Sequence, residues 1–513
     1  MNNCMVPFHH TAAQSMPISR SRYPVAASEP LVRSATQTLA QQLAQRLGAR
    51  IQDHLLPPGS RLPSVRQCAA QQNLSPSTVV SAYDLLLAQG LIVAQRGRGY
   101  FVRAAAPAPQ RSTLAGRGAK GTERMVAPRN AAALIRSMFQ SQGSRAQPGM
   151  GVLPHEWLDT PFLGAALRRV SQNFPQTGSA LSYGEPMGDS SLRHALSNRL
   201  HHLGLPVPAD QIITTMGATQ ALDIVSRTLL KPGDAVMVEE PGWAVEFARL
   251  EAQGMRILPV PRGAQGPDLA VMERLCQAHS PKLYVSVSTL HNPTGACLTP
   301  ASAHRVLQLA QQHAFFIVED DTYSHLAPEH ATRMSVLDGL QRTIYVSGFA
   351  KIVAPNWRIG YLAAPTALVE RLLDTKLLST LTTPNLLERA LAVCIEQGQL
   401  RRHTQRVRQR LDDARGRSVR LATAHACQLM AEPAGLFGWI DTGVDTELLA
   451  QRLLDHDLLI APGALFHAAR TPSRLMRINF ATTQDAAFWS VFARCRDEIL
   501  KGAGPLTGSA TGV

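Results

Sequence analysis

The chain has 513 residues, 45% hydrophobic and 17% charged, which is long enough for two or more globular domains. Its net charge of +14 is uneven: residues 1–150 hold 17 Lys and Arg against 4 Asp and Glu, residues 151–513 hold 34 against 33. No apolar run is long enough to span a bilayer and the N-terminus has no secretion-signal pattern, which predicts a cytoplasmic protein. The seven cysteines have no CxxC spacing, which argues against a disulfide framework and a zinc site.

Residues 1–32 have no hydrophobic periodicity and are predicted to be disordered. A helical pattern begins at Ser34, with an apolar residue at every fourth position in Leu39, Leu43, Leu47 and Ile51. A short second helix is expected within residues 60–70, with Pro63 near its first turn.

A third helix is expected from Pro76, with Ser75 as a candidate N-cap. Its predicted apolar face is Val79, Ala82, Tyr83 and Leu86. Residues 91–102 then predict two short strands joined by a basic, glycine-rich tip.

Three helices and a hairpin predict a winged helix-turn-helix over residues 33–103. The third helix would enter a DNA major groove, and Arg96 and Arg98 on the wing would reach phosphates or the minor groove. The positive charge of this part of the chain favours a polyanionic partner, with double-stranded DNA as the first candidate. The alternatives are a solvated basic segment and a helical bundle without a DNA role.

This segment resembles the DNA-binding domain of the GntR regulator family, and it carries the motifs Pro58-Gly-Ser-Arg-Leu-Pro-Ser-Val-Arg66, Thr78-Val-Val-Ser-Ala-Tyr-Asp-Leu85, Gly90-Leu91 and Arg96-Gly-Arg-Gly-Tyr-Phe-Val102. One position differs, because Pro76 stands where the family usually has an arginine. The resemblance implies DNA contacts from Arg61, Ser64, Arg66, Ser75, Ser77, Thr78, Arg96 and Arg98.

Residues 104–147 are rich in Ala, Pro and Gly and are predicted to form a flexible basic linker. Within it, residues 104–145 carry 7 Lys and Arg against 1 acid, which is expected to add modest non-specific affinity for DNA. Residues 503–513 are expected to form a flexible tail.

Residues 148–502 alternate strands and helices, which predicts a large α/β domain with a mostly parallel sheet. Several strands end in residues suited to binding. Gly217-Ala-Thr-Gln220 opens a helix whose free N–H groups could cradle a phosphate. Trp243 would either stack on a cofactor ring or pack in the core.

Asn292, in an Asn-Pro turn, is expected at the carboxyl edge of the sheet, where such folds bind ligands. Glu319-Asp320-Asp321 follows the apolar run 315–318. An acid there could bond a pyridinium nitrogen, and at least one of the three acids is expected in a solvated loop.

Lys351 follows the predicted strand Thr343–Val346 and the break at Gly348, and Arg358 lies seven residues further on. A lysine against apolar walls loses its proton more easily, and its neutral amine can condense with an aldehyde. An arginine fork suits a phosphate, so the pair suggests pyridoxal phosphate, with a surface lysine as the alternative.

Arg477 stands alone in the apolar strand 475–480 and needs an anionic partner. A substrate carboxylate fits this requirement, and a buried structural ion pair is the alternative.

Residues from about 148 to 500 resemble the fold-type I aminotransferases, on motifs that occur in the family's order: Tyr183-Gly, Gly217-Ala-Thr-Gln, Trp243, Asn292-Pro-Thr-Gly, Asp320 to Tyr323, Lys351 to Arg358, and Arg477. Joined to the GntR-like segment, they resemble the MocR group of transcription regulators. The implied fold is an N-terminal winged helix-turn-helix plus a fold-type I transferase domain with a smaller C-terminal α+β subdomain.

The resemblance also implies roles for single residues. Lys351 would bond covalently to pyridoxal phosphate, and Arg477 would grip the α-carboxylate of an incoming amino acid. The remaining cofactor contacts would be Asp320 to the pyridine nitrogen, Asn292 and Tyr323 to the ring hydroxyl, Trp243 to the ring face, and Ala218, Thr219 and Arg358 to the phosphate. Tyr183 would reach the phosphate of a neighbouring subunit, which implies a homodimer.

The expected function is therefore a DNA-binding transcription regulator that senses an amino acid or amine through its pyridoxal phosphate domain. The alternatives are an active aminotransferase with an accessory DNA-binding domain and a DNA-binding scaffold that has lost its cofactor. Gly348 and Ala350 stand where relatives usually carry serine, which counts against turnover.

Overall fold

The computed structural model describes residues 37–52, 56, 59–95, 98–103, 147–158, 160–173 and 182–502. The predictions for residues 1–32, 104–146 and 503–513 concern parts of the chain outside these ranges. In the described part, no helix is long and apolar enough to cross a membrane.

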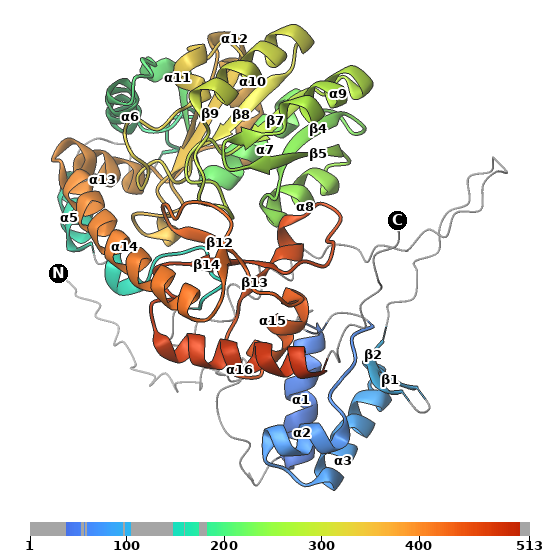
Figure 1. The fold of residues 1–513 in the computed structure, drawn as a ribbon. Helices are drawn as coiled ribbons and strands as arrows, with labels where there is room; N and C mark the ends of the chain where they lie inside the picture. The colour runs from blue at the N-terminus through green and yellow to red at the C-terminus, as the bar shows by residue number, and fades with distance from the viewer. Residues whose placement is uncertain are drawn as a thin grey trace, which may run out of the picture.

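The N-terminal domain has the predicted order of three helices and a hairpin (Figure 1), with the elements α1 Leu39–Gln52, α2 Val65–Gln72, α3 Pro76–Ala88, β1 Ile92–Gln95 and β2 Gly99–Val102. The predicted apolar face of α3 is fully buried and packs against Leu43, Leu47 and Ile51 of α1. Ser75 caps α3 as expected, because its side chain accepts a hydrogen bond from the Thr78 N–H.

The expected helix within residues 60–70 was placed too early. α2 begins at Val65 because Ser64 and Gln67 form a reciprocal capping box, which fixes the first turn after Ser64. Pro63 therefore lies before the cap and not in the first turn of the helix.

The large domain is built on an eight-stranded mixed sheet in the order β3-β10-β9-β8-β7-β4-β5-β6. The central strands β9, β8, β7, β4 and β5 are parallel neighbours, and the pairs β3–β10, β10–β9 and β5–β6 are antiparallel. The strand bounds are β3 Ile212–Thr215, β4 Ala235–Glu240, β5 Arg256–Gly263, β6 Gly266–Pro267, β7 Leu283–Ser286, β8 Phe316–Asp320, β9 Thr343–Gly348 and β10 Gly360–Ala363.

Helices cover both faces of this sheet. One apolar cluster joins it to α7 Ala218–Leu229 and α12 Thr366–Thr380, and another joins its opposite face to α9 Leu269–His279 and α10 Pro300–His313. The strands are therefore buried on both faces, as parallel strands require. The other helices of this domain are α5 Pro161–Asn173, α6 Ser190–His202, α8 Ala244–Ala252, α11 Met334–Asp338 and α13 Asn385–Glu396, with the short 3-10 helices η1 His155–Trp157, η4 Ala209–Gln211 and η5 Pro355–Trp357.

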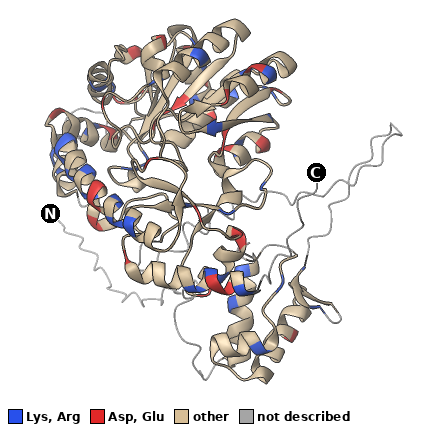
Figure 2. Ribbon diagram, in the orientation of Figure 1, with Lys and Arg blue, Asp and Glu red and all other residues tan. Residues whose placement is uncertain are grey.

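The long helix α14 Gln399–Ala424 leads into the smaller subdomain (Figure 1), and Figure 2 shows basic positions along it. The subdomain holds a four-stranded antiparallel sheet in the order β11-β12-β14-β13, which agrees with the expected α+β arrangement. Its elements are β11 Gln428–Leu429, β12 Phe437–Asp441, α15 Thr446–Leu454, β13 Ala461–Pro462, η6 Gly463–Phe466, β14 Leu475–Asn479 and α16 Ala486–Gly502.

The DNA-binding domain touches this smaller subdomain through α1, which lies beside α15 in Figure 1. Arg50 Nη1 lies 3.0 Å from Asp455 Oδ1, and Arg50 Nη2 donates to the Leu454 carbonyl oxygen at 3.2 Å. The two domains therefore meet at the C-terminal end of α15.

Candidate functional site

The candidate site lies where the parallel strands of the large sheet end. Trp243 follows β4, Asn292 follows β7, Asp320 ends β8 and Lys351 follows β9. The carboxyl ends of parallel strands share one edge, and ligands of open α/β sheets bind there.

Lys351 lies in the turn after β9, inside the protein. Its Nζ donates to the Gly151 carbonyl oxygen at 2.8 Å and lies 5.8 Å from the centroid of the Tyr323 ring. Burial lowers the pKa of Lys351 from 10.5 to about 8; the positive charges of Arg477 and Arg358 add to this, and Asp320 opposes it. Its amine is therefore far more often neutral at physiological pH than that of an exposed lysine.

We expect the reactivity of Lys351 toward an aldehyde to follow this lowered pKa. At pH 8 about half of its amines are neutral, compared with about 0.3% for a lysine with a pKa of 10.5. In cofactor-free protein, the initial rate of pyridoxal phosphate attachment should rise with pH to a midpoint near 8, as followed by absorbance. A rate that rises only above pH 10 would contradict the buried environment of this amine.

Asp320 lies at the end of β8, and burial raises its pKa to about 6. The Thr322 N–H, at 3.0 Å from Asp320 Oδ1, and the Thr322 hydroxyl oppose this rise, and the negative charges of Glu246 and Asp321 add to it. A cation placed beside Asp320 would favour its charged form, which is what a pyridinium nitrogen would supply.

The expectation that one of the three acids lies in a solvated loop is wrong. Glu319 and Asp321 are fully buried, and Asp320 is half-buried. Glu319 accepts the Met334 and Ser335 N–H groups at 2.6 and 2.8 Å. Asp321 accepts Arg333 Nε at 2.6 Å and the Tyr345 hydroxyl at 2.8 Å, so these two acids stabilise the fold below the site.

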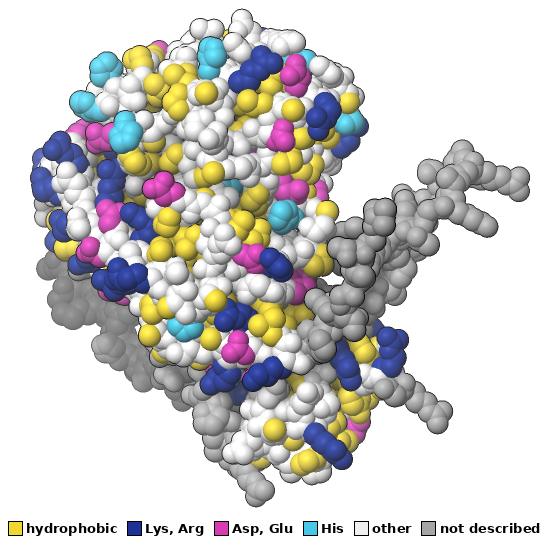
Figure 3. Space-filling model, viewed as in Figure 1, with side chains coloured by type: hydrophobic (Ala, Val, Ile, Leu, Met, Phe, Trp, Pro, Cys, Tyr) yellow, Lys and Arg dark blue, Asp and Glu magenta, His cyan; other side chains and the backbone are white. Residues whose placement is uncertain are grey.

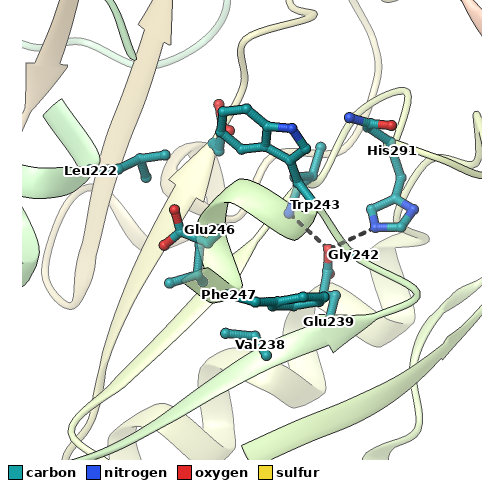
Figure 4. Close-up of a pocket in the computed structure, with 12 residues that line it drawn as sticks. Leu222, Val238, Glu239, Gly242, Trp243, Glu246, Phe247 and His291 are labelled. Carbon is teal, nitrogen blue, oxygen red and sulfur yellow. Dashed lines mark hydrogen bonds and ion pairs between the residues drawn. The ribbon is translucent and has the colours of Figure 1, made fainter. Parts of the chain in front are cut away.

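A pocket is lined by residues that include Trp243, Asn292 and Asp320 (Figure 4). In Figure 4 the Trp243 indole lies over the pocket, with Leu222 and Glu246 on one side and His291 on the other. The residues predicted to contact the ring and its nitrogen thus share one cavity. The aromatic side chain suits stacking against a flat heteroaromatic ring.

The predicted phosphate cradle lies at the start of α7. Gly217 caps the helix with φ 84°, and a Cβ on it would meet Arg358 Nη2 at 2.8 Å. Arg358 is exposed, and its Nη2 donates to the Met216 carbonyl oxygen at 2.9 Å. Ala218 and Thr219 supply the first helical N–H groups, which are free to bind an anion beside the arginine.

Two further glycines lie against this cradle. A Cβ on Gly360 would meet the Gly217 carbonyl carbon at 2.4 Å, so no side chain fits there. A Cβ on Gly348 would lie 3.5 Å from the Ala218 nitrogen and 3.3 Å from the Ile359 carbonyl oxygen, so it would fit after a shift of a few tenths of an ångström. A serine at position 348 would therefore bring a hydroxyl to the cradle, and this chain lacks that donor.

Arg477 on β14 is a buried cation held by neutral groups. Its Nη1 donates to Asn292 Oδ1 at 2.8 Å and its Nη2 to the Gly149 carbonyl oxygen at 2.5 Å, and its guanidinium carbon lies 4.4 Å from the Phe437 ring centroid. Among the described residues no carboxylate pairs with it, and its Nε lacks a hydrogen-bond partner. Burial lowers the pKa of Arg477 to about 10, with Tyr323 opposing the shift, so an anionic ligand would be stabilised strongly here.

Tyr323 and Asn292 connect the lysine to the arginine. Tyr323 is 6% exposed, packs edge-on against Phe437 at 5.5 Å and forms a side-chain hydrogen bond with Asn292. Burial raises the pKa of Tyr323, so it remains a neutral donor. Tyr183 differs from this group, because 82% of its surface is exposed.

Sequence reasoning missed the polar network below the pocket. Glu239 on β4 pairs with the buried Arg262 of β5, accepts the Tyr284 hydroxyl at 3.0 Å and lies 3.3 Å from His291 Nε2. Burial and Arg262 hold the pKa of His291 well below its usual value, so the ring is neutral. The carbonyl groups of Gly149 and Gly151 were also missed, because backbone acceptors leave no signal in the sequence.

The predicted DNA contacts are mostly accessible. Arg66 and Arg98 are exposed, and the Arg61 guanidinium lies against Gly99 at the base of the wing. Ser64 and Ser75 are exposed but cap α2 and α3, Ser77 is exposed and bonds Ser75 at 2.8 Å, Thr78 is half-buried, and Arg96 lies outside the described residues.

The described residues fit pyridoxal phosphate. They supply an amine with a lowered pKa, an acid facing the same pocket, an aromatic side chain over it, a helix start with an arginine for the phosphate, and a buried cation without an acid partner. The described residues form no metal-binding cluster, and their cysteines are unpaired.

Comparison with known proteins gave two family matches. The family described as "Aminotransferase class I and II" matches residues 158–488, and the family described as "Bacterial regulatory proteins, gntR family" matches residues 39–102. The chain is 29% identical over 452 residues to the "Uncharacterized HTH-type transcriptional regulator YdcR" of Escherichia coli strain K12, covering 86% of this chain and 94% of that protein.

It is also 28% identical over 476 residues to the "HTH-type transcriptional regulator TauR" of Rhodobacter capsulatus, covering 89% of this chain and 96% of that protein. Among solved structures, the α-aminoadipate aminotransferase LysN of Thermus thermophilus, complexed with N-(5'-phosphopyridoxyl)-L-leucine, matches with a TM-score of 0.64 and 22% identity. That match covers 72% of this chain and 95% of LysN and supports the fold.

Proposed function

Because the chain belongs to the aminotransferase class I and II family and joins that domain to a GntR-type DNA-binding domain, we propose that it is a MocR-type transcription regulator whose effector is an amino acid or an amine. Its cofactor is pyridoxal phosphate. The proposal rests above all on one observation: the buried Arg477 lies in the same site as Lys351 and has no acidic partner among the described residues.

When bound, pyridoxal phosphate supplies an aldehyde carbon and an electron-accepting ring. Lys351 would hold the cofactor through its amine, which its lowered pKa makes neutral far more often than the amine of an exposed lysine. Asp320 would bond the ring nitrogen, Asn292 and Tyr323 would bond the ring hydroxyl, and Trp243 would cover the ring. Arg477 would bind the carboxylate of an effector whose amine replaces that of Lys351.

The route from this site to the DNA-binding domain runs through η6. The Gly242 N–H, next to Trp243, donates to the Phe466 carbonyl oxygen at 2.8 Å, and the Phe466 ring centroid lies 5.2 Å from the Arg477 guanidinium carbon. η6 contacts α15, whose end meets α1 at Asp455. An effector that draws Arg477 toward the cofactor would therefore move α15 relative to Arg50.

The proposed assembly is a cytoplasmic homodimer. The exposed ring of Tyr183 is accessible to a second subunit, where the resemblance to fold-type I aminotransferases implies a contact with the cofactor phosphate. Sedimentation of the purified chain tests this assembly.

The function is tested by selecting bound duplexes from a random-sequence pool with the full chain, and then titrating the selected duplex in the presence of amino acids and amines. A compound that changes both the visible absorbance of the cofactor and the DNA affinity supports the proposal. Cofactor binding without any effect of any such compound on DNA binding would contradict it.

We expect the N-terminal domain to carry phosphate contacts that salt dependence reveals. Arg66→Gln and Arg98→Gln should each make the slope of log K against log salt shallower by about 1, because each phosphate contact releases about one counterion. The measurement is fluorescence anisotropy of the selected duplex at several salt concentrations. Exposed Arg256→Gln, at the start of β5, is the control and should leave the slope unchanged; equal effects from all three would contradict the assignment.

Aminotransferase activity is the second candidate function, since the site keeps a lysine, an acid and a carboxylate-binding arginine. Steady turnover of an amino donor that depends on a keto acid would favour it. The absence of hydroxyls at Gly348 and Ala350 favours sensing instead.

A further inference from the structure

A second concentration of positive charge lies on α14, far along the chain from the DNA-binding domain. This helix holds 8 Arg against 2 Asp. The remainder of residues 151–513 holds 26 Lys and Arg against 31 Asp and Glu. The aminotransferase-like part is therefore acidic apart from this helix, which is strongly basic.

The arginines form a stripe along one face of the helix. With 3.6 residues per turn, the α14 arginine stripe, defined here as Arg402, Arg406, Arg410, Arg417 and Arg420, falls within an arc of about 80° and extends over about 27 Å. All five side chains are exposed. The opposite face, with Val407, Leu411 and Ala414 among its residues, is buried against the domain. In Figure 3 basic side chains gather on the left side of the molecule, where α14 lies in Figure 1.

One acid, the exposed Asp413, lies within the arc of the stripe between Arg410 and Arg417, so the five arginines keep a net excess of positive charge on this face. None of its members pairs with an acid in the described part of the chain: Arg402 and Arg410 donate to the carbonyl oxygens of Gln397 and Glu156, each at 3.3 Å, and Arg417 donates to Gln484 Oε1 at 2.6 Å. Like charges four residues apart on a helix repel by a few tenths of a kcal/mol per pair. An anionic partner that binds along the row would relieve this repulsion.

We propose that the α14 arginine stripe contacts the phosphate backbone of duplex DNA, as a second DNA surface beyond the winged helix-turn-helix. A length of about 27 Å matches about eight base pairs at about 3.4 Å per step along one strand. Arginine forks bind phosphate oxygens in pairs. The exposed residues in and beside the stripe include Gln405, Gln409 and Asp413, which are polar and offer no apolar anchor for a protein groove or a lipid surface.

The inference rests on the proposed function only in that the N-terminal domain brings DNA to the protein. A duplex held by that domain and extending past α15 and α16 would run toward α14, which contacts α16. The stripe would then add sequence-independent affinity and set the path of the flanking DNA.

The test uses the full chain with cofactor, a fluorescent duplex of about 60 base pairs and mixed sequence, and a variant carrying Arg402→Gln, Arg406→Gln, Arg410→Gln and Arg420→Gln. We expect the slope of log K against log salt to become shallower by about 2 to 4, and the affinity at about 0.1 M salt to fall at least tenfold. The same four positions changed to lysine should keep the slope, because the charge is retained.

The matched control removes the same charge from the far side of the large domain, with the exposed residues Lys231→Gln, Arg256→Gln, Arg274→Gln and Lys282→Gln. It should change the affinity less than twofold. An unchanged slope in the α14 variant would overturn the inference, as would an equal loss in the control. The inference would also be overturned if the α14 variant lost binding to anionic phospholipid vesicles and kept its affinity for DNA.

Both variants should keep the cofactor absorbance, which reports folding of the large domain. Failure of the stripe is distinguishable from failure of the proposed function, because the Arg66 and Arg98 variants test the N-terminal domain separately.

Discussion

Lys351→Ala is expected to abolish the visible absorbance that the protein acquires with pyridoxal phosphate and retains through desalting. The cofactor would then be held only by the phosphate cradle and the ring contacts, because Lys351 is the lysine whose Nζ lies beside Tyr323 and whose charge interacts with Asp320. The response of DNA binding to amino acids should disappear with it. Spectra before and after desalting, with DNA titrations on the same samples, measure both effects.

Lys376, a second buried lysine, allows a stringent test of this prediction. Burial lowers its pKa to about 8, as for Lys351, but its Nζ is enclosed and donates to the Pro186 carbonyl oxygen at 2.6 Å. A lowered pKa alone would therefore not distinguish Lys351 from Lys376 as the site of cofactor attachment. After borohydride reduction, peptide mapping should find the cofactor on Lys351 only, and exposed Lys282→Ala should leave the absorbance unchanged. Cofactor found on Lys376 would refute the assignment.

Arg477→Leu is expected to weaken the apparent affinity for α-amino acids by about 30-fold or more, because removing one partner of a buried charge pair costs about 2–5 kcal/mol. An amine of the same skeleton without the carboxylate should bind as it does to the parent protein. Titration of the cofactor absorbance with both compounds separates the two contributions.

The fold should tolerate this substitution. Arg477 has no acid partner among the described residues, so replacing it by an apolar side chain leaves no opposite charge unpaired. The acceptors on Asn292 and Gly149 lose a donor, so the thermal midpoint should fall slightly while the protein still folds. Arg474→Leu is the control, since Arg474 is exposed on the same strand segment and pairs with Asp441. An equal loss for the amine and the amino acid, or for both variants, would argue against a carboxylate site.

Much of the site could be predicted from the sequence because each chemical group directly follows a buried strand. The apolar runs before Asp320 and Lys351 identify β8 and β9, and neighbouring parallel strands bring their ends to one edge. The same logic located Asn292 and Gly217 without any knowledge of contacts.

The sequence could not predict contacts that depend on strand order. Glu239 and Arg262 meet because β4 and β5 are neighbours, and nothing in their local sequence indicates that pairing. The burial of Glu319 and Asp321 depends on partners such as Ser335 and Arg333, which lie beyond the strand end. Three consecutive acids resemble a solvated loop until those donors are known.

The pairing of Arg50 with Asp455 leaves 12% and 31% of the two side chains exposed. An ion pair with this much solvent access typically contributes about 0.2–1 kcal/mol. Breaking an ion pair this weak costs little free energy. A difference of about 1.4 kcal/mol between two states already changes their population ratio tenfold. The DNA-binding domain would thus be close to equilibrium between its docked and released positions. Partial occupancy of the distant pocket by an effector would then be enough to shift that equilibrium.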